Sequence, residues 1–387
     1  MSAVTAFATA YPSATDGKIA VINLQSARQR SWSRFAGDPH RVGVAELIVE
    51  QESQAVQFLS DFSALDRLDM LATQIAQAGL PPARRMLIQA QVAAIGHRFD
   101  EARRYLAVAE DAGADTELID RLASSIDQAC GVSLYALLDK RRRIATEADS
   151  LEELLPLGAL LVDLSEFDEA DEVFRRALRA YSDVSPFAVA QVCFQLGILW
   201  GETVSDPQTD VAAQWYRRAV GYIPAYTKAR VHLAEILNSC GRLDEAGALL
   251  TPIAGSSDPE VQWRLADILF EKGDVAEAQA YLQAACLRFE HLLQRYPLAF
   301  ADHGAEFFAG SGNNPGRAVE LARLNVANRP TLRAFEFAHA IAVSTGNTAA
   351  ASELLVEAGQ RWGGTNAFRI SSLARCAAEN FEGTTAR

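Results

Sequence analysis

One spacing of small and large residues recurs along this chain and constrains its fold more than any other feature. In most copies a bulky residue is followed by Gly or Ala, then by a large residue three positions later. In three copies an Ala comes nine positions after that, and the other three have a short insertion before this Ala. In most copies another large residue follows the Ala by four. The six copies begin at Leu157, Leu196, Leu233, Leu265, Gly304 and Phe337. A catalytic motif is rarely written several times, so the pattern indicates a structural repeat.

The spacing is typical of two antiparallel helices that pack closely. Small residues are needed where the backbones approach, and large residues at i, i+3 and i+4 fill the space between helices. Gly241 and Gly273 fall where a turn with positive φ is needed. Pro224 and Pro330 fall where each second helix must stop. One such pair cannot bury both of its faces, so the pairs must stack. We expect an all-α solenoid of about eight or nine helical hairpins.

This series of Leu-Gly, aromatic, Ala, aromatic, Ala and Pro positions resembles the tetratricopeptide repeat. Residues 151–364 carry the resemblance well, and residues 96–110 carry part of it. The unit at 196–222 is similar to a Sel1-like repeat, because its turn is longer and it contains the pair Trp215-Tyr216. The resemblance implies a right-handed superhelix whose first helices line a concave face.

The chain divides into four segments by pattern. Residues 1–42 lie outside the repeat and carry five Lys or Arg against two Asp. We expect them to form a basic, irregular N-terminal arm with strand-like composition at 18–24. The arm either rests loosely on the first helices or folds across the acidic solenoid or a partner. Divergent helical repeats then occupy 43–150, regular repeats 151–364, and a capping helix with a tail 365–387.

Composition limits the partners and the compartment. The net charge of -13 disfavours binding to nucleic acid or to anionic lipid. No run of 18 apolar residues predicts a membrane span. The five cysteines are scattered singly, which favours a reducing compartment over disulfides or zinc sites. We therefore expect a cytoplasmic, bacterial protein that binds neither nucleic acid nor membrane.

The sequence offers no motif for catalysis. The nucleotide-binding, hydrolase, zinc-protease and deaminase signatures are all missing. The six histidines are far apart, and none shares an i, i+4 helical face with another. Pairs of acids at helix starts are explained by the helix dipole. We predict no enzyme activity, no cofactor and no metal.

The resemblance also predicts where a partner would bind. In such repeats the first helix of each unit lines the concave groove. In this chain aromatic residues recur on that face, in addition to those that fill the space between paired helices. The predicted groove residues are Phe194, Ile198, Lys228, Val231, Glu235, Trp263, Asp267, Phe270, Phe308, Phe335 and His339.

We therefore predict a scaffold or adaptor that holds a partner protein or peptide in a concave groove. Two alternatives remain open at this stage. One is an accessory or substrate-recognition subunit of an enzyme system, such as a modifying transferase or maturation machinery. The other is a peptide-responsive regulator, although the N-terminal arm is too short and irregular for the usual DNA-binding domain.

Overall fold

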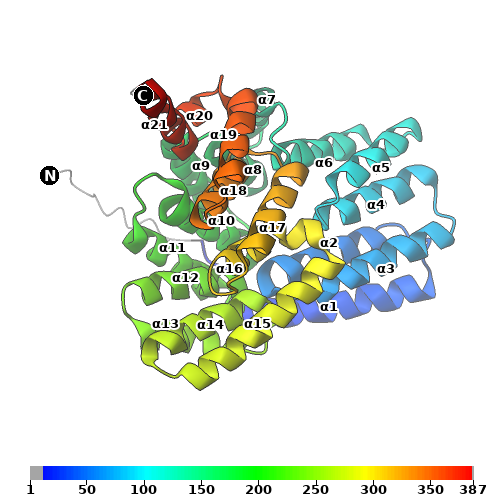
Figure 1. Cartoon of the computed structure of the whole chain (residues 1–387). Helices are drawn as coiled ribbons and strands as arrows, with labels where there is room; N and C mark the ends of the chain where they lie inside the picture. Colours follow the sequence, from blue (N-terminus) through cyan, green and yellow to red (C-terminus); the bar gives the residue numbers. More distant parts are fainter. Residues whose placement is uncertain (1–11, 386–387) are drawn as a thin grey trace.

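The computed structural model describes residues 12–385, and the regular structure of those residues is entirely helical (Figure 1). Eighteen consecutive helices form nine pairs that stack in chain order, which confirms the expected solenoid. The pairs are α2 (Val44–Leu59) with α3 (Ser63–Gln77), α4 (Pro82–Ile95) with α5 (Phe99–Asp111), α6 (Thr116–Ala129) with α7 (Leu134–Glu147), α8 (Leu151–Asp163) with α9 (Phe167–Ala180), α10 (Pro186–Ile198) with α11 (Thr209–Tyr222), α12 (Thr227–Ser239) with α13 (Leu243–Leu250), α14 (Pro259–Lys272) with α15 (Val275–Arg295), α16 (Pro297–Ala309) with α17 (Pro315–Asn328), and α18 (Leu332–Ser344) with α19 (Thr348–Trp362).

The seams between paired helices explain the repeat pattern. A Cβ added at Gly158 would lie 2.5 Å from the ring of Phe174, which is the aromatic residue of the same copy. A Cβ at Gly197 would likewise collide with the ring of Tyr216. The Gly therefore leaves room for an aromatic ring from the second helix. The turn glycines have positive φ as expected, +72° at Gly241 and +88° at Gly273.

The N-terminal arm is helical over most of its length, so the prediction of an irregular arm is wrong for residues 17–37. These residues form α1 (Gly17–Gly37), whose first turn is capped by the carboxylate of Asp16. The strand-like composition at 18–24 is overridden because Arg28 and Trp32 both bind Glu52 on α2. Residues 1–11 of the predicted arm lie outside the described residues.

The C-terminal end also differs from expectation. One closing helix was expected, but residues 366–385 form two helices, α20 (Asn366–Ile370) and α21 (Ser372–Thr385). Between them Ser371 is extended and buried, and its hydroxyl donates to the carbonyl of Phe368, 2.6 Å away. Tested for length and apolar character, none of the helices within 12–385 could cross a membrane.

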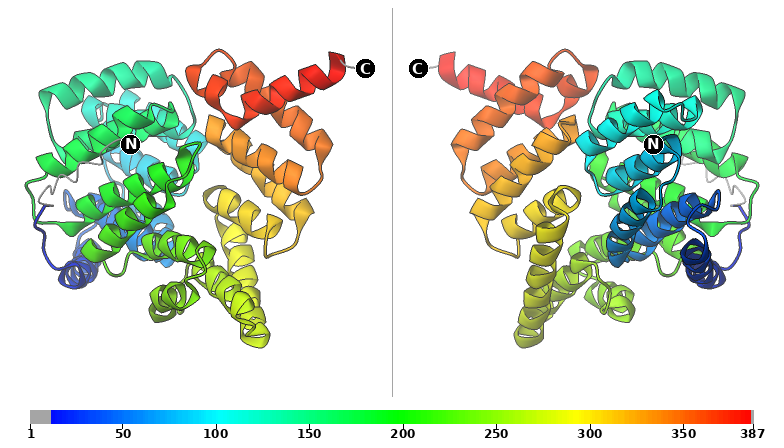
Figure 2. Two further views of the ribbon diagram at one scale, coloured as in Figure 1. Left: turned by 90° about the vertical axis from the view of Figure 1, so that its left-hand side faces the viewer. Right: turned by 90° about the vertical axis from the view of Figure 1, so that its right-hand side faces the viewer.

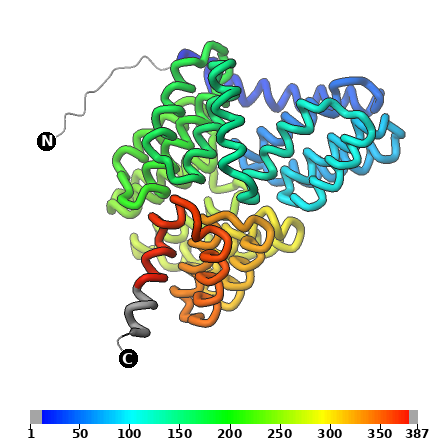
Figure 3. Tube along the Cα trace, turned by 90° about the horizontal axis from the view of Figure 1, so that it is seen from above, coloured from blue at the N-terminus to red at the C-terminus, as the bar shows by residue number. Residues whose placement is uncertain are grey.

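The row of hairpins curls until its early and late parts touch. The later hairpins climb from α13 at the bottom to α21 at the top in Figure 2, and the view from above shows the curl (Figure 3). The turn between α2 and α3 contacts the first turns of α12, α14 and α16. There the Ser60 hydroxyl donates to Asp258, 2.7 Å away, and the Phe62 and Phe300 rings lie 4.8 Å apart.

The core follows this curl. One large cluster of buried apolar side chains runs from α7 to the C-terminal helices, and it also includes Leu24 of α1 and Phe58, Phe62 and Leu65 from the first hairpin. Two smaller clusters fill the first three hairpins. The interior of the superhelix is therefore occupied by the chain itself along much of its length.

Candidate functional site

Five of the predicted groove residues lie in the core instead of on an open surface. Each is less than one-tenth exposed, and these residues are Phe194, Val231, Trp263, Phe308 and Phe335. Trp263 packs edge-on against Phe307 at 5.4 Å, and its indole N–H donates to Ser311 at 2.9 Å. A contact role does not fit these five side chains, because the curl of the chain packs them against neighbouring helices.

The other six predicted groove residues keep some exposure to solvent. Phe270 is the most open among the apolar ones, with 38% of its surface exposed. Glu235 and Asp267 are half-buried, and both are bound by Arg264. The six are Ile198, Lys228, Glu235, Asp267, Phe270 and His339.

A row of charged side chains crosses the inner face of α12, α14 and α16. His232 Nδ1 lies 2.8 Å from Glu202 and 3.4 Å from Glu235. Arg264 then contacts Glu235 and reaches Glu306 at 3.1 Å. We call this set, together with Asp267, the ionic row. It contains two cations, His232 and Arg264, among four carboxylates, and each cation contacts at least two of them. Pairing of this kind allows charges to stay in a partly buried place.

A second ion pair lies beside the ionic row, between half-exposed His303 and Glu260. His303 Nδ1 is 2.5 Å from Glu260, and the neighbouring Asp302 is bound by Arg329. Burial alone would lower the pKa of His303, but Glu260 and Asp302 outweigh it and raise the pKa to about 10. Burial would also lower the pKa of His232, but Glu202 and Glu235 outweigh it and raise that pKa to about 9.

These pKa values predict a pH-dependent stability with a definite sign. Both histidines hold a proton in the folded chain at a pH where the unfolded chain, with an ordinary pKa near 6.5, has released it. Their contribution is complete below about pH 6.5 and disappears as the pH rises through 9 to 10. His232→Gln should therefore melt at a lower temperature than the wild type at pH 6, and the difference should vanish near pH 10.5. A difference that stays constant with pH would contradict this assignment.

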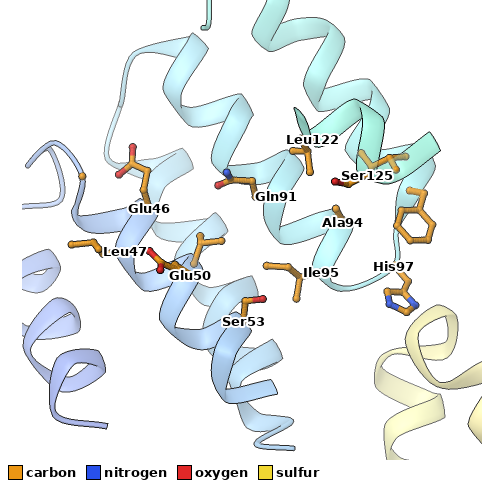
Figure 4. A pocket seen from close by; sticks show the side chains of 14 residues that line it. Glu46, Leu47, Glu50, Ser53, Gln91, Ala94, Ile95, His97, Leu122 and Ser125 are labelled. Atoms are coloured by element: carbon orange, nitrogen blue, oxygen red, sulfur yellow. The ribbon is translucent and has the colours of Figure 1, made fainter. Parts of the chain in front are cut away.

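An open groove lies on the inner face of the first three hairpins. It has a volume of about 820 Å³ and is walled by α2, α4 and α6 (Figure 4). Leu47, Ile95 and Leu122 give the groove apolar surface, and Leu47 is 42% exposed. Its polar lining residues are Glu46, Glu50, Ser53, Gln91, His97 and Ser125.

His97 marks the end of this groove that faces the later hairpins. Its backbone is left-handed, with φ of 56°, and its ring stacks on Phe99 with centroids 5.4 Å apart. Burial, helped by the nearby Arg329, lowers its pKa to about 4, so the ring stays neutral. Its carbonyl accepts a hydrogen bond from the Asn328 amide, 3.0 Å away. His97 therefore connects the wall of the groove with hairpin α16–α17.

The hairpin of α14 and α15 shows which family of repeat is present. Residues 259–288, which cover α14 and most of α15, match the family model described as tetratricopeptide repeat. The chain carries a tetratricopeptide repeat. The match confirms the resemblance read from the sequence, whereas the Sel1-like assignment of residues 196–222 stays a prediction. In the structure that unit has a π-helical turn at Leu199–Thr203 before its long loop.

Solved structures of other repeat proteins are similar at a distance. The chain is 15% identical to PilF of Pseudomonas aeruginosa, over 57% of this chain and 95% of that one, with a TM-score of 0.30. It is 15% identical to yeast Tom70, over 95% and 87%, with a TM-score of 0.40. No curated protein sequence matches the chain. These likenesses are too distant to transfer a function.

Two features of this array of hairpins were missed in the sequence. The ionic row could have been found, because three successive first helices carry a cation and an acid three residues later, as HLAE, RLAD and HGAE from 232, 264 and 303. The open groove had no such signal. It lies in the divergent hairpins of 43–150, where the repeat spacing does not mark the inner face.

Proposed function

We propose that this protein is a non-catalytic scaffold that binds a segment of a partner protein in the groove between α2, α4 and α6. One observation carries the proposal, which is the groove itself. Its 820 Å³, apolar surface and polar rim have the size and composition of known ligand and peptide sites. Stacked hairpins hold the three walls in place, so the scaffold needs little ordering when a partner binds.

The net charge and the cysteines support the choice of partner and compartment. A chain with a net charge of -13 repels phosphate backbones, so we propose a protein partner. The five cysteines are free thiols, as expected for a protein that acts in the cytoplasm. The six accessible positions predicted from the repeat, Phe270 among them, remain proposed as secondary contacts.

The proposal predicts that filling the groove abolishes partner binding. Ala94 lines the groove from α4, and Ala94→Trp would place an indole ring in the space that a partner needs. A random displayed library is first used to select peptides that bind the full-length wild type. These peptides should bind Ala94→Trp at least about tenfold more weakly, which corresponds to a loss of about 1.4 kcal/mol in binding free energy. Fluorescence anisotropy with the selected peptides measures this change.

The matched control is Ala349→Trp on α19, where the alanine is exposed and far along the chain from the groove. It should bind the selected peptides as the wild type does, and thermal melting checks that both variants fold. Equal binding by wild type and Ala94→Trp would overturn the proposal. A selection that returns no specific peptide would also count against it.

A further inference from the structure

The charges around the groove point to the chemistry of its partner. Within the described chain, the groove is lined by two carboxylates and by no Lys or Arg. The one histidine that lines it, His97, is neutral because burial lowers its pKa. The groove therefore has a negative edge and no positive charge of its own.

The three glutamates of α2 differ in a way that isolates one of them. Glu46 is held by Arg84 through two hydrogen bonds of 2.7 and 2.9 Å. Glu52 is buried and bound by Arg28 and Arg67. Glu50 is exposed at the groove, and the described residues provide neither an ion pair nor a hydrogen bond for its carboxylate. It is thus available to a cation from outside.

Glu50 lies next to apolar surface. Leu47, one turn earlier on α2, is 42% exposed, and Figure 4 shows both side chains on the same wall of the groove. The opposite wall offers Ile95 and Leu122 with the uncharged Gln91. A matching partner therefore needs an apolar face with a positive charge at one edge of that face.

The length of the groove sets the length of the segment. Its α2 wall runs from Gly43 to Ser53, which is about 15 Å at a rise of about 1.5 Å per residue. About three turns of helix cover this distance and place side chains at i, i+3, i+4 and i+7 on one face. We propose that the occupant is a short amphipathic helix of a second protein, with Lys or Arg beside its apolar face. This inference rests on the proposed function of the groove.

Three synthetic peptides test the inference. They share one apolar face of leucines at i, i+3, i+4 and i+7, and carry Lys, Gln or Glu at the flanking positions. The Lys peptide should bind the full-length protein most tightly and the Glu peptide most weakly, as measured by fluorescence anisotropy. Glu50→Gln should weaken the Lys peptide about three- to fivefold, the size expected for one solvent-exposed ion pair, and leave the Gln peptide unchanged.

The control removes an equal charge elsewhere. Glu172 on α9 is exposed, and Glu172→Gln should leave the Lys peptide at wild-type affinity. If Glu172→Gln weakens binding as much as Glu50→Gln does, the attraction is a general effect of net charge and the inference fails. It also fails if the Gln peptide binds the wild type as tightly as the Lys peptide. Ala94→Trp separates the two proposals. If the peptides bind Ala94→Trp weakly but bind Glu50→Gln as tightly as the wild type, the groove is the binding site and the proposal of a cationic partner is wrong.

Discussion

Replacing Trp263 by Ala should lower the free energy of unfolding by about 3–5 kcal/mol. The ring is 3% exposed and packs against Phe289 and Phe307, while the Arg264 guanidinium lies 3.5 Å from its centroid. Truncation would leave a cavity between α14 and its neighbours, and the Ser311 hydroxyl would lose a donor. Urea denaturation followed by circular dichroism measures the loss. Hydrogen exchange should show it first in α14 and α15, because repeat arrays can unfold locally.

Phe270 on the same helix provides the control. Its ring is 38% exposed, so Phe270→Ala should change the free energy of unfolding by no more than about 0.5 kcal/mol. Both residues were predicted from the repeat spacing to face a partner, and the structure separates them. Equal small effects of the two substitutions would show that the Trp263 ring is not part of the core.

The hairpins were predictable because their information is local. The contact between Gly158 and Phe174, and the left-handed glycines at the turns, follow from spacings of a few residues to about one repeat. The spacing that predicts the contact between two paired helices also predicts the order in which the pairs stack. Each hairpin must bury its remaining apolar face against the next hairpin along the chain. The match of residues 259–288 to a family model lies in one of these regular units.

The curl of the solenoid was not predictable in this way. Ser60 meets Asp258, and Asn328 meets His97, across about 200 residues or more of chain. These contacts arise from small rotations added over many hairpins, and no single spacing encodes the sum. The same curl buries five of the predicted groove residues, Phe194 and Trp263 among them. The other six keep some exposure, and an open groove remains at the divergent hairpins.

The N-terminal helix was missed because its stability comes from partners on another helix. Alone, residues 17–37 mix β-branched, polar and basic residues and show no clean apolar stripe. Besides its buried Leu24 and Phe35, α1 is anchored by the side chain of Glu52. Glu52 is 1% exposed and accepts hydrogen bonds from Arg28 and Trp32 of α1 and from Arg67 of α3. Asp61 shares both arginines, at 2.8 and 2.7 Å.

Glu52→Ala should therefore be among the most destabilising single changes in the chain, at about 3–5 kcal/mol, because it leaves two arginines around one remaining carboxylate. It should also release α1, so that trypsin cuts after Arg28, Arg30 and Arg34 under native conditions. Glu50→Ala, two residues earlier and exposed, should alter stability by no more than about 0.5 kcal/mol and leave digestion at the wild-type rate. Mass spectrometry of timed digests distinguishes the two variants. If α1 of Glu52→Ala is cut no faster than that of the wild type, the helix is held by its apolar contacts with the core, through Leu24 and Phe35, and not by the buried carboxylate.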